Sequence, residues 1–310
     1  MISSPHAPPA VTEFDYAPRQ VWDAPIPLRI WHLASLDAPT IAVVWALGFA
    51  WAAHVRLPLW SPVLLALVAL TVYIGDRLLD ARAGMISPQF HTLRDRHYFH
   101  WRHREILGAC AIASGGLATW IVLALVPSRA LKPDTVAAAA AVAYFSTVHF
   151  RLNLPPALAR LLKPILSREF VIGTLFTVAC VLPVWSRPGS SFGPDLAHSV
   201  MIAPMIFFAA VAWHNCRAIS LWESDGNAIY ADRVLPWAKR LGLAGFAAAA
   251  LLAYPDPRPA ALLASCAVSA LLLGALDRMR HHITPLALRS YADLVLLTPL
   301  LLMPLSKLIR

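Results

Sequence analysis

Apolar residues occur along this 310-residue chain in long continuous runs. Each run is close to the ~20 residues that a transmembrane helix needs, and the runs lack the apolar/polar alternation of a membrane β-barrel strand. We therefore predict an all-α polytopic membrane protein with nine transmembrane helices. The predicted spans are residues 39–55, 61–80, 106–126, 134–150, 165–185, 199–219, 240–255, 259–276 and 291–306.

Composition agrees with this pattern. Hydrophobic residues make up 58% of the chain, charged residues only 14%, and the mean hydropathy is +0.60, well outside the balance of a soluble domain. Residues 1–30 contain no long apolar run and are rich in Pro and Ala. They are expected to form a flexible cytoplasmic arm in front of a transmembrane domain at residues 31–310.

Basic residues predict the orientation of these spans. With the N-terminus inside, nineteen of the 26 Lys and Arg residues fall in cytoplasmic segments, as the positive-inside rule requires. This places the protein in a membrane such as the bacterial inner membrane. The net charge of +9 then lies mostly on the cytoplasmic face, where it suits anionic lipids or a phosphorylated substrate. No nucleic-acid module is recognisable.

Two carboxylates, Asp76 and Asp80, end the second predicted span. Residues four apart lie on one face of a helix, so both acids can face one divalent cation. An acid inside a membrane span is a functional-site hypothesis by default. The alternative is a helix-end pair solvated by headgroups and neutralised by Arg77 and Arg82.

A second group of polar residues ends the sixth predicted span. Asn215 and Glu223 are eight residues apart, about two helical turns, and Asp225 follows them. The orientation above places them on the same face of the membrane as Asp76. Taken alone, the pattern also fits an ordinary helix exit with an interfacial tryptophan at Trp222.

Together, these two sites resemble the UbiA superfamily of intramembrane prenyltransferases. The segments 163–170 and 288–293 are also similar to sequences of that family. The resemblance implies a UbiA-type bundle in which aspartate-rich motifs hold Mg²⁺ against the diphosphate of an isoprenoid donor. It implies catalytic roles for Asp76, Asp80, Asn215 and Glu223, and metal ligation by Asp76, Asp80, Glu223 and Asp225. The implied diphosphate-binding residues are Arg77, Arg94, Arg96, Lys163, Arg168 and Arg217.

The motifs depart from the family pattern. Val72 and Tyr73 stand where the family has an Asn-Asp pair, and Cys216 and Ile219 replace acids of the second motif. Two functions therefore stay open: Mg²⁺-dependent prenyl transfer from an isoprenyl diphosphate to a lipophilic acceptor, and binding or transport of an isoprenoid or other lipid by a catalytically silent relative. A CDP-alcohol phosphotransferase lacks support, because nothing after Gly84 continues its motif.

Histidines and cysteines complete the candidate chemistry. His97, His100 and His103 form a stripe on a basic-aromatic segment, for which an interfacial helix or lid is favoured over a metal site. His32 and His214 are expected at the membrane interface near helix ends, and His214 beside Asn215 is also a candidate phosphate partner. The four cysteines are isolated and are interpreted as small apolar fillers.

Overall fold

The computed structural model describes residues 21–86, 95–126, 167–185, 194–223 and 234–303. Regular structure in these ranges is helical, apart from one isolated parallel bridge between Trp22 and Ile283. The helices are α1 (Ile26–Leu33), α2 (Asp37–Ala52), α3 (Trp60–Ile86), α4 (Asp95–Arg102), α5 (Arg104–Leu125), α8 (Arg168–Trp185), α9 (Pro194–Glu223), α11 (Val234–Ala253), α12 (Pro257–Met279), α13 (Pro285–Leu294) and α14 (Pro299–Leu302), with short 3₁₀ turns at Arg280–His282 and Val295–Leu297.

The described helices confirm an all-α membrane protein. Six helical segments are long and apolar enough to cross a membrane, and the bent pair α1–α2 makes up to seven. Helix α11 corresponds to the predicted span 240–255 but is not among them, and it carries Lys239 and Arg240 in its first half. The predicted span 134–150 lies outside the described residues, so the count of nine stays a prediction.

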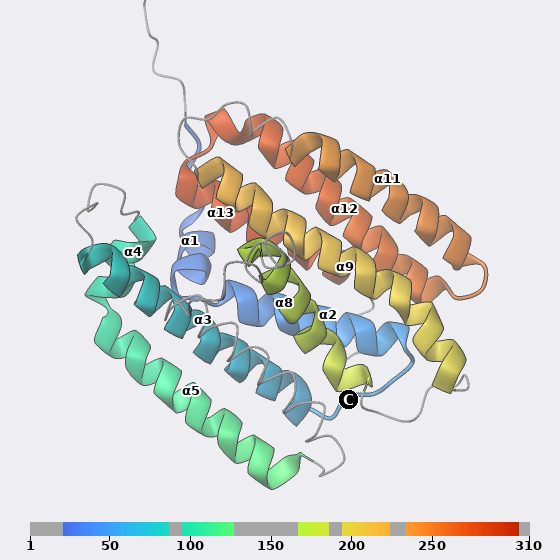
Figure 1. The fold of residues 1–310 in the computed structure, drawn as a ribbon, viewed down its shortest axis with the longest axis horizontal. Helices are drawn as coiled ribbons and strands as arrows, with labels where there is room; N and C mark the ends of the chain where they lie inside the picture. Colours follow the sequence, from blue (N-terminus) through green and yellow to red (C-terminus); the bar gives the residue numbers. More distant parts are fainter. Residues whose placement is uncertain (1–20, 87–94, 127–166, 186–193, 224–233, 304–310) are drawn as a thin grey trace, which may run out of the picture.

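The helices pack as two groups joined by a central pair (Figure 1). Helices α9, α11 and α12 lie side by side, α3 and α5 form a second group, and α2 and α8 lie between them. Glycines allow close crossings: a Cβ on Gly173 of α8 would lie 2.7 Å from the backbone nitrogen of Trp213 in α9. Small residues at helix crossings let backbones approach inside a membrane, where van der Waals packing drives helix association.

Aromatic side chains fill the centre of the bundle. Trp45 of α2 stacks on Phe208 of α9 with 3.8 Å between ring centroids, and both side chains are fully buried. The indole nitrogen of Trp45 donates a hydrogen bond of 2.8 Å to the carbonyl oxygen of Leu296, which satisfies the polar atom of a buried tryptophan. Cys180 and Cys266 belong to the same core, in agreement with their interpretation as apolar fillers.

A sharp bend separates α1 from α2. The two helices meet at 89°, and Ser35 between them has a φ of 61°, a left-handed conformation that is uncommon for a residue other than glycine. Ser35 is also fully buried. The bend turns the polar residues around it into the bundle, where they form part of the site described below.

Residues 21–30, which the sequence assigned to a flexible arm, fold onto the bundle. The backbone nitrogen of Trp22 donates to the carbonyl oxygen of His282 at 2.7 Å, and that of Thr284 donates to Trp22 at 2.9 Å. Helix α1 begins within the same stretch. The first described residues are therefore held against the last part of the chain, next to α13.

Candidate functional site

Charged residues gather around one cavity of about 180 Å³. It lies where the C-terminal half of α3, the start of α8, the end of α9, and α13 meet, with α4 beside them. The residues that line it are Tyr73, Asp76, Arg77, Asp80, Arg96, His97, His100, Arg168, Glu169, Ile172, Asn215, Cys216, Ile219, Ser220, Glu223, Arg289 and Asp293.

The cavity brings together the two polar groups that the sequence singled out. All four candidate catalytic residues line it: Asp76, Asp80, Asn215 and Glu223. Three candidate diphosphate-binding residues, Arg77, Arg96 and Arg168, line it as well. Arg217 does not, since its guanidinium lies over the ring of Trp213 at 5.8 Å. The remaining candidates, Arg94, Lys163 and Asp225, lie outside the described residues.

Asp76 and Asp80 form one wall with Arg168. The Nη2 atom of Arg168 lies 3.7 Å from Oδ2 of Asp76 and 3.5 Å from Oδ2 of Asp80. The two carboxylates are partly exposed, at 28% and 32% of their side-chain surface. A positive charge therefore already sits against both acids, and it belongs to a half-exposed side chain that can move.

Glu223 of α9 connects three helices beside the cavity. Its Oε1 atom accepts a hydrogen bond of 2.7 Å from Nη1 of Arg289 in α13 and lies 3.5 Å from Nη1 of Arg96 in α4. Both guanidinium groups are mostly buried, with exposures of 19% and 17%. Charge-assisted contacts of this kind fix orientation as well as adding energy, so Glu223 holds two cationic groups beside the cavity.

Asn215 also lines the cavity and has an oxygen without a partner among the described residues. It is 4% exposed, and its Nδ2 donates to Oδ1 of Asp293 at 3.4 Å. Its Oδ1 has no hydrogen-bond partner within the described part of the chain. Leaving a buried acceptor unsatisfied costs ~1–3 kcal/mol, and an amide oxygen suits a hard divalent cation.

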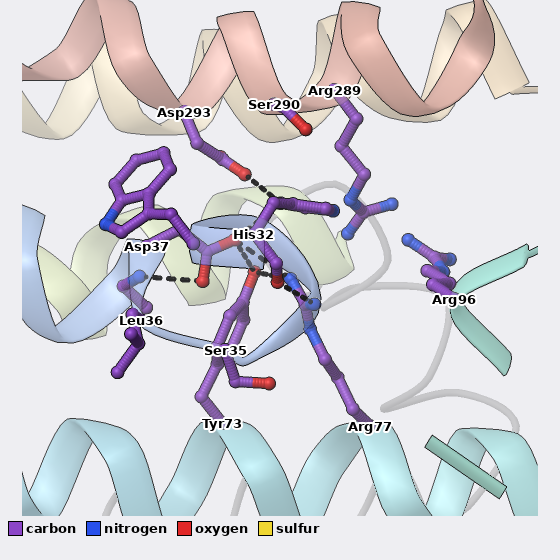
Figure 2. A network of polar contacts seen from close by, with 12 residues as sticks. His32, Ser35, Leu36, Asp37, Tyr73, Arg77, Arg96, Arg289, Ser290 and Asp293 are labelled. Atoms are coloured by element: carbon purple, nitrogen blue, oxygen red, sulfur yellow. Dashed lines mark hydrogen bonds and ion pairs between the residues drawn. The ribbon is translucent and has the colours of Figure 1, made fainter. Parts of the chain in front are cut away.

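A second layer of polar residues lies behind the cavity (Figure 2). Nδ1 of His32 is 2.7 Å from Oδ2 of Asp37 and 3.2 Å from Oδ2 of Asp293. The side chains of His32 and Asp37 are 0% and 1% exposed. The bend between α1 and α2 thus delivers an imidazole and a carboxylate from one edge, and α13 delivers the second carboxylate from the other.

Arg77 neutralises this layer. Its Nη2 atom lies 3.0 Å from Oδ2 of Asp37 and donates to the hydroxyl of Tyr73 at 2.6 Å, while Nη1 donates to the carbonyl oxygen of His32 at 2.8 Å. Tyr73 is thereby part of the same network. Arg77 borders the cavity, but most of its donors serve the protein itself.

Helix α4 carries the histidine stripe to the edge of the cavity. His100 is 1% exposed, and its Nε2 lies 3.1 Å from Oγ of Ser35 at the bend. Burial, together with the nearby Arg77 cation, lowers the pKa of His100 to about 3, so the ring is neutral. His97 lines the cavity. The stripe therefore faces the protein interior at His100, and the interfacial helix or lid stays a prediction.

Sequence reasoning missed part of the site. His32 and His214, which were expected at the membrane interface, are 0% and 1% exposed and lie inside the bundle. Asp37 lay in no recognised motif, and Arg289 and Asp293 entered only within the family-like segment 288–293. The available signal was the rarity of acids and histidines in such an apolar chain, since buried ionisable groups in membrane helices are costly.

Two groups of side chains must be compared as metal sites. His32, Asp37 and Asp293 offer ligand atoms that all lie within 4.8 Å of one another. However, the Arg77 guanidinium already contacts Asp37, and it would repel a second cation. Asp76, Asp80 and the unused oxygen of Asn215 border the cavity and offer oxygen atoms, the donors that Mg²⁺ prefers. Arg168 contacts both acids in the same way, but its side chain is half-exposed.

No protein-family model, curated protein or solved structure matches this chain in comparisons with known proteins. The case for a function therefore rests on the residues around the cavity.

Proposed function

We propose that this chain is an intramembrane prenyltransferase, which moves a prenyl group from an isoprenyl diphosphate to a lipophilic acceptor with the help of Mg²⁺. One observation carries the proposal. The acids and the amide predicted as its catalytic residues come from distant helices, α3 and α9, and line the same cavity.

The charges around the cavity favour a metal-bound anion over a bare one. Five carboxylates and four guanidinium groups border it: those of Asp76, Asp80, Glu169, Glu223 and Asp293, and those of Arg77, Arg96, Arg168 and Arg289. A diphosphate alone would add negative charge to a site with no excess of positive charge. A divalent cation between the acids and the phosphates removes that conflict.

The size of the cavity suits a head group. Its volume of about 180 Å³ is below the ~300–1,000 Å³ of pockets that enclose a whole drug-sized ligand. A diphosphate fits such a space, whereas a long prenyl chain must extend beyond it. Ile172 and Ile219 provide apolar surface at its border.

The side chains around the cavity would have two roles, binding of Mg²⁺ and binding of the phosphate oxygens. Asp76, Asp80 and Asn215 would hold Mg²⁺, which supplies charge neutralisation for the departing diphosphate. Arg96 and Arg289, already oriented by Glu223, donate hydrogen bonds to phosphate oxygens. Arg168 can leave the two acids for the phosphate when the metal takes its place. Such preorganised donors act strongly in a site of low dielectric constant.

Binding and turnover of geranylgeranyl diphosphate test the proposal. The full-length protein in lipid nanodiscs should bind this donor in a Mg²⁺-dependent manner and release pyrophosphate. Asp76→Asn and Asp80→Asn should each weaken Mg²⁺-dependent binding at least ~10-fold, since hydrogen bonds and contacts to charged groups are worth ~1.5–3 kcal/mol. Glu105→Gln is the matched control, because Glu105 is an exposed carboxylate on α5. If both aspartate variants bind the donor with Mg²⁺ as tightly as the wild type, the proposal is wrong.

A catalytically silent lipid-binding protein is the second candidate. Val72 and Tyr73 replace an Asn-Asp pair of the family motif, and Tyr73 accepts a hydrogen bond from Arg77. In that case the same protein binds the donor with Mg²⁺ but releases no pyrophosphate with any acceptor offered. The binding and release measurements together therefore separate the two functions.

A further inference from the structure

We propose that Ser35 and His100 are positioning residues that hold Arg96 at the edge of the cavity, where its guanidinium meets the diphosphate of the donor. This inference deepens the proposed function and rests on it. Two hydrogen bonds connect a strained serine at the bend between α1 and α2 to the backbone of Arg96.

Ser35 occupies the position after α1 where glycine is the usual residue. The backbone nitrogen of Leu36 donates to the carbonyl oxygen of Trp31 at 3.0 Å, and that of Ser35 donates to His32 at 3.1 Å. These two bonds form the Schellman motif that ends many helices, and the left-handed residue in that motif is most often a glycine. Ser35 has a φ of 61°, so a side chain is kept there against the preference of the backbone. A residue in such a conformation is a candidate for a functional role.

The hydroxyl group of Ser35 supplies a reason for this side chain. Ser35 is fully buried, and its Oγ lies 3.1 Å from Nε2 of His100. Nδ1 of His100 lies 2.8 Å from the carbonyl oxygen of Arg96, which can only accept, so Nδ1 carries the proton of the neutral ring. Nε2 is then an acceptor, and the Ser35 hydroxyl donates to it. Glycine would suit the backbone but would remove this donor.

His100 is the residue through which α4 enters the bundle. It is the buried residue of this eight-residue helix, at 1% exposed, and the other side chains of α4 are partly or fully exposed. The helix packs against α3 and also contacts α1 and α5. The hydrogen bond with Ser35 thus ties the buried side of α4 to the bend.

Arg96 requires positioning because it shares a carboxylate with a second cation. Its Nη1 lies 3.5 Å from Oε1 of Glu223, the same atom that accepts a hydrogen bond of 2.7 Å from Arg289. The guanidinium groups of Arg96 and Arg289 lie next to each other in Figure 2. Two neighbouring cations repel each other, and Arg96 has the longer contact with Glu223. Fixing its backbone keeps the guanidinium at the cavity before the donor binds, as a preorganised site requires.

The far end of α2 carries the same backbone motif away from the cavity. There, Val55 donates to Ala50 at 2.9 Å and His54 donates to Trp51 at 3.2 Å, and His54 has a φ of 58°. The side chain of His54 contacts the start of α12 and does not line the cavity. His54→Gly is therefore the matched control for Ser35→Gly, because both remove a side chain from a left-handed position of a Schellman motif.

Hydrogen–deuterium exchange tests the attachment of α4 without any donor. In the full-length protein in nanodiscs, Ser35→Gly should make the amides of α4 exchange about tenfold faster, as expected for the loss of one hydrogen bond. His100→Phe, which keeps a ring but removes both hydrogen bonds, should have the same effect. The amides of α12 should exchange as in the wild type, and His54→Gly should leave α4 unchanged. If α4 exchanges equally in the wild type and in Ser35→Gly, the inference is wrong.

Binding of geranylgeranyl diphosphate with Mg²⁺ tests whether Ser35 acts through Arg96. Ser35→Gly should weaken this binding about 5- to 10-fold and Arg96→Gln about 10- to 100-fold, whereas His54→Gly should bind as the wild type does. The double variant Ser35→Gly/Arg96→Gln should bind no more weakly than Arg96→Gln, because a positioning residue has no further effect once the residue that it positions is gone. Additive losses would show a merely structural role and would overturn the inference.

The two measurements separate this inference from the proposed function. A wild type that binds no donor defeats the proposed function. Exchange in α4 then still decides whether Ser35 and His100 hold Arg96, since that measurement contains no donor: faster exchange in Ser35→Gly supports the attachment, and unchanged exchange overturns it.

Discussion

Nη2 of Arg77 lies 3.0 Å from Oδ2 of Asp37, with both side chains almost fully buried. Removing one partner of a buried pair leaves an uncompensated charge. We expect Arg77→Met to lower the free energy of unfolding by ~3–5 kcal/mol, measured by denaturation in detergent micelles.

The double variant Arg77→Met/Asp37→Leu removes both charges and should recover part of that loss. The exposed pair of Arg29 and Asp23, at 42% and 48% side-chain exposure, provides the control: Arg29→Met should change stability by ~0–1 kcal/mol. If Arg77→Met and Arg29→Met lower the free energy of unfolding equally, the prediction for the buried Arg77–Asp37 pair is wrong.

His100 should make stability depend on pH. Burial and the nearby Arg77 cation lower its pKa to about 3, below the ~6.5 of an unfolded histidine. The unfolded chain therefore binds a proton more readily as the pH falls below ~6.5, and stability declines from there towards pH 3. The melting temperature between pH 7.5 and 5 measures this decline.

His100→Gln should flatten the dependence over that range, because it removes the titrating group. His103→Gln is the comparison, since His103 is on the same stripe but lies between α4 and α5, where its ring contacts the carbonyl oxygen of Phe99. The prediction fails if the two substitutions alter the pH profile by the same amount.

Gly173 should tolerate no side chain. A Cβ at this position would lie 2.7 Å and 2.9 Å from the backbone nitrogen and Cα of Trp213, so α8 and α9 must separate. Overpacking of this kind costs ~1–3 kcal/mol. Gly173→Ala should lower the melting temperature, whereas Gly116→Ala on α5, where the added Cβ meets nothing within 4 Å, should leave it unchanged or raise it.

Arg168 should matter for the donor, and Arg217 should not. Arg168 touches both acids of α3, whereas Arg217 stacks on Trp213 away from the cavity. Arg168→Gln should weaken binding of geranylgeranyl diphosphate ~10- to 100-fold, as expected for the loss of one charge-assisted hydrogen bond. Arg217→Gln serves as the matched control in the same titration, and a comparable loss there would contradict the location of the site.

The sequence was sufficient to predict an all-α membrane protein and to single out four polar residues, Asp76, Asp80, Asn215 and Glu223, that line one cavity. Long apolar runs reveal spans because a membrane admits little else, and the acids at 76 and 80 stand out against such a background. The spacing along one helix also brought Asn215 and Glu223 into consideration. What the sequence could not show was which distant residues meet, because that depends on how helices cross.

His32 and Asp37 show why the remainder was out of reach. They lie on either side of an 89° bend at Ser35, which has a φ of 61°. A serine in this strained conformation cannot be predicted from the residue pattern. Arg217 shows the opposite case, a predicted diphosphate-binding residue that does not line the cavity. It lies two residues after Asn215, but its guanidinium lies over the ring of Trp213.

The pairing of Trp22 with residues 282–284 has a consequence for biosynthesis. Chains are made from the N-terminus at ~5–20 residues per second. Trp22 is therefore synthesised long before residues 282–284, to which it is hydrogen-bonded. His32 and Asp37 therefore reach the membrane well ahead of Asp293. The cavity is completed only when α13, with Arg289 and Asp293, has been made.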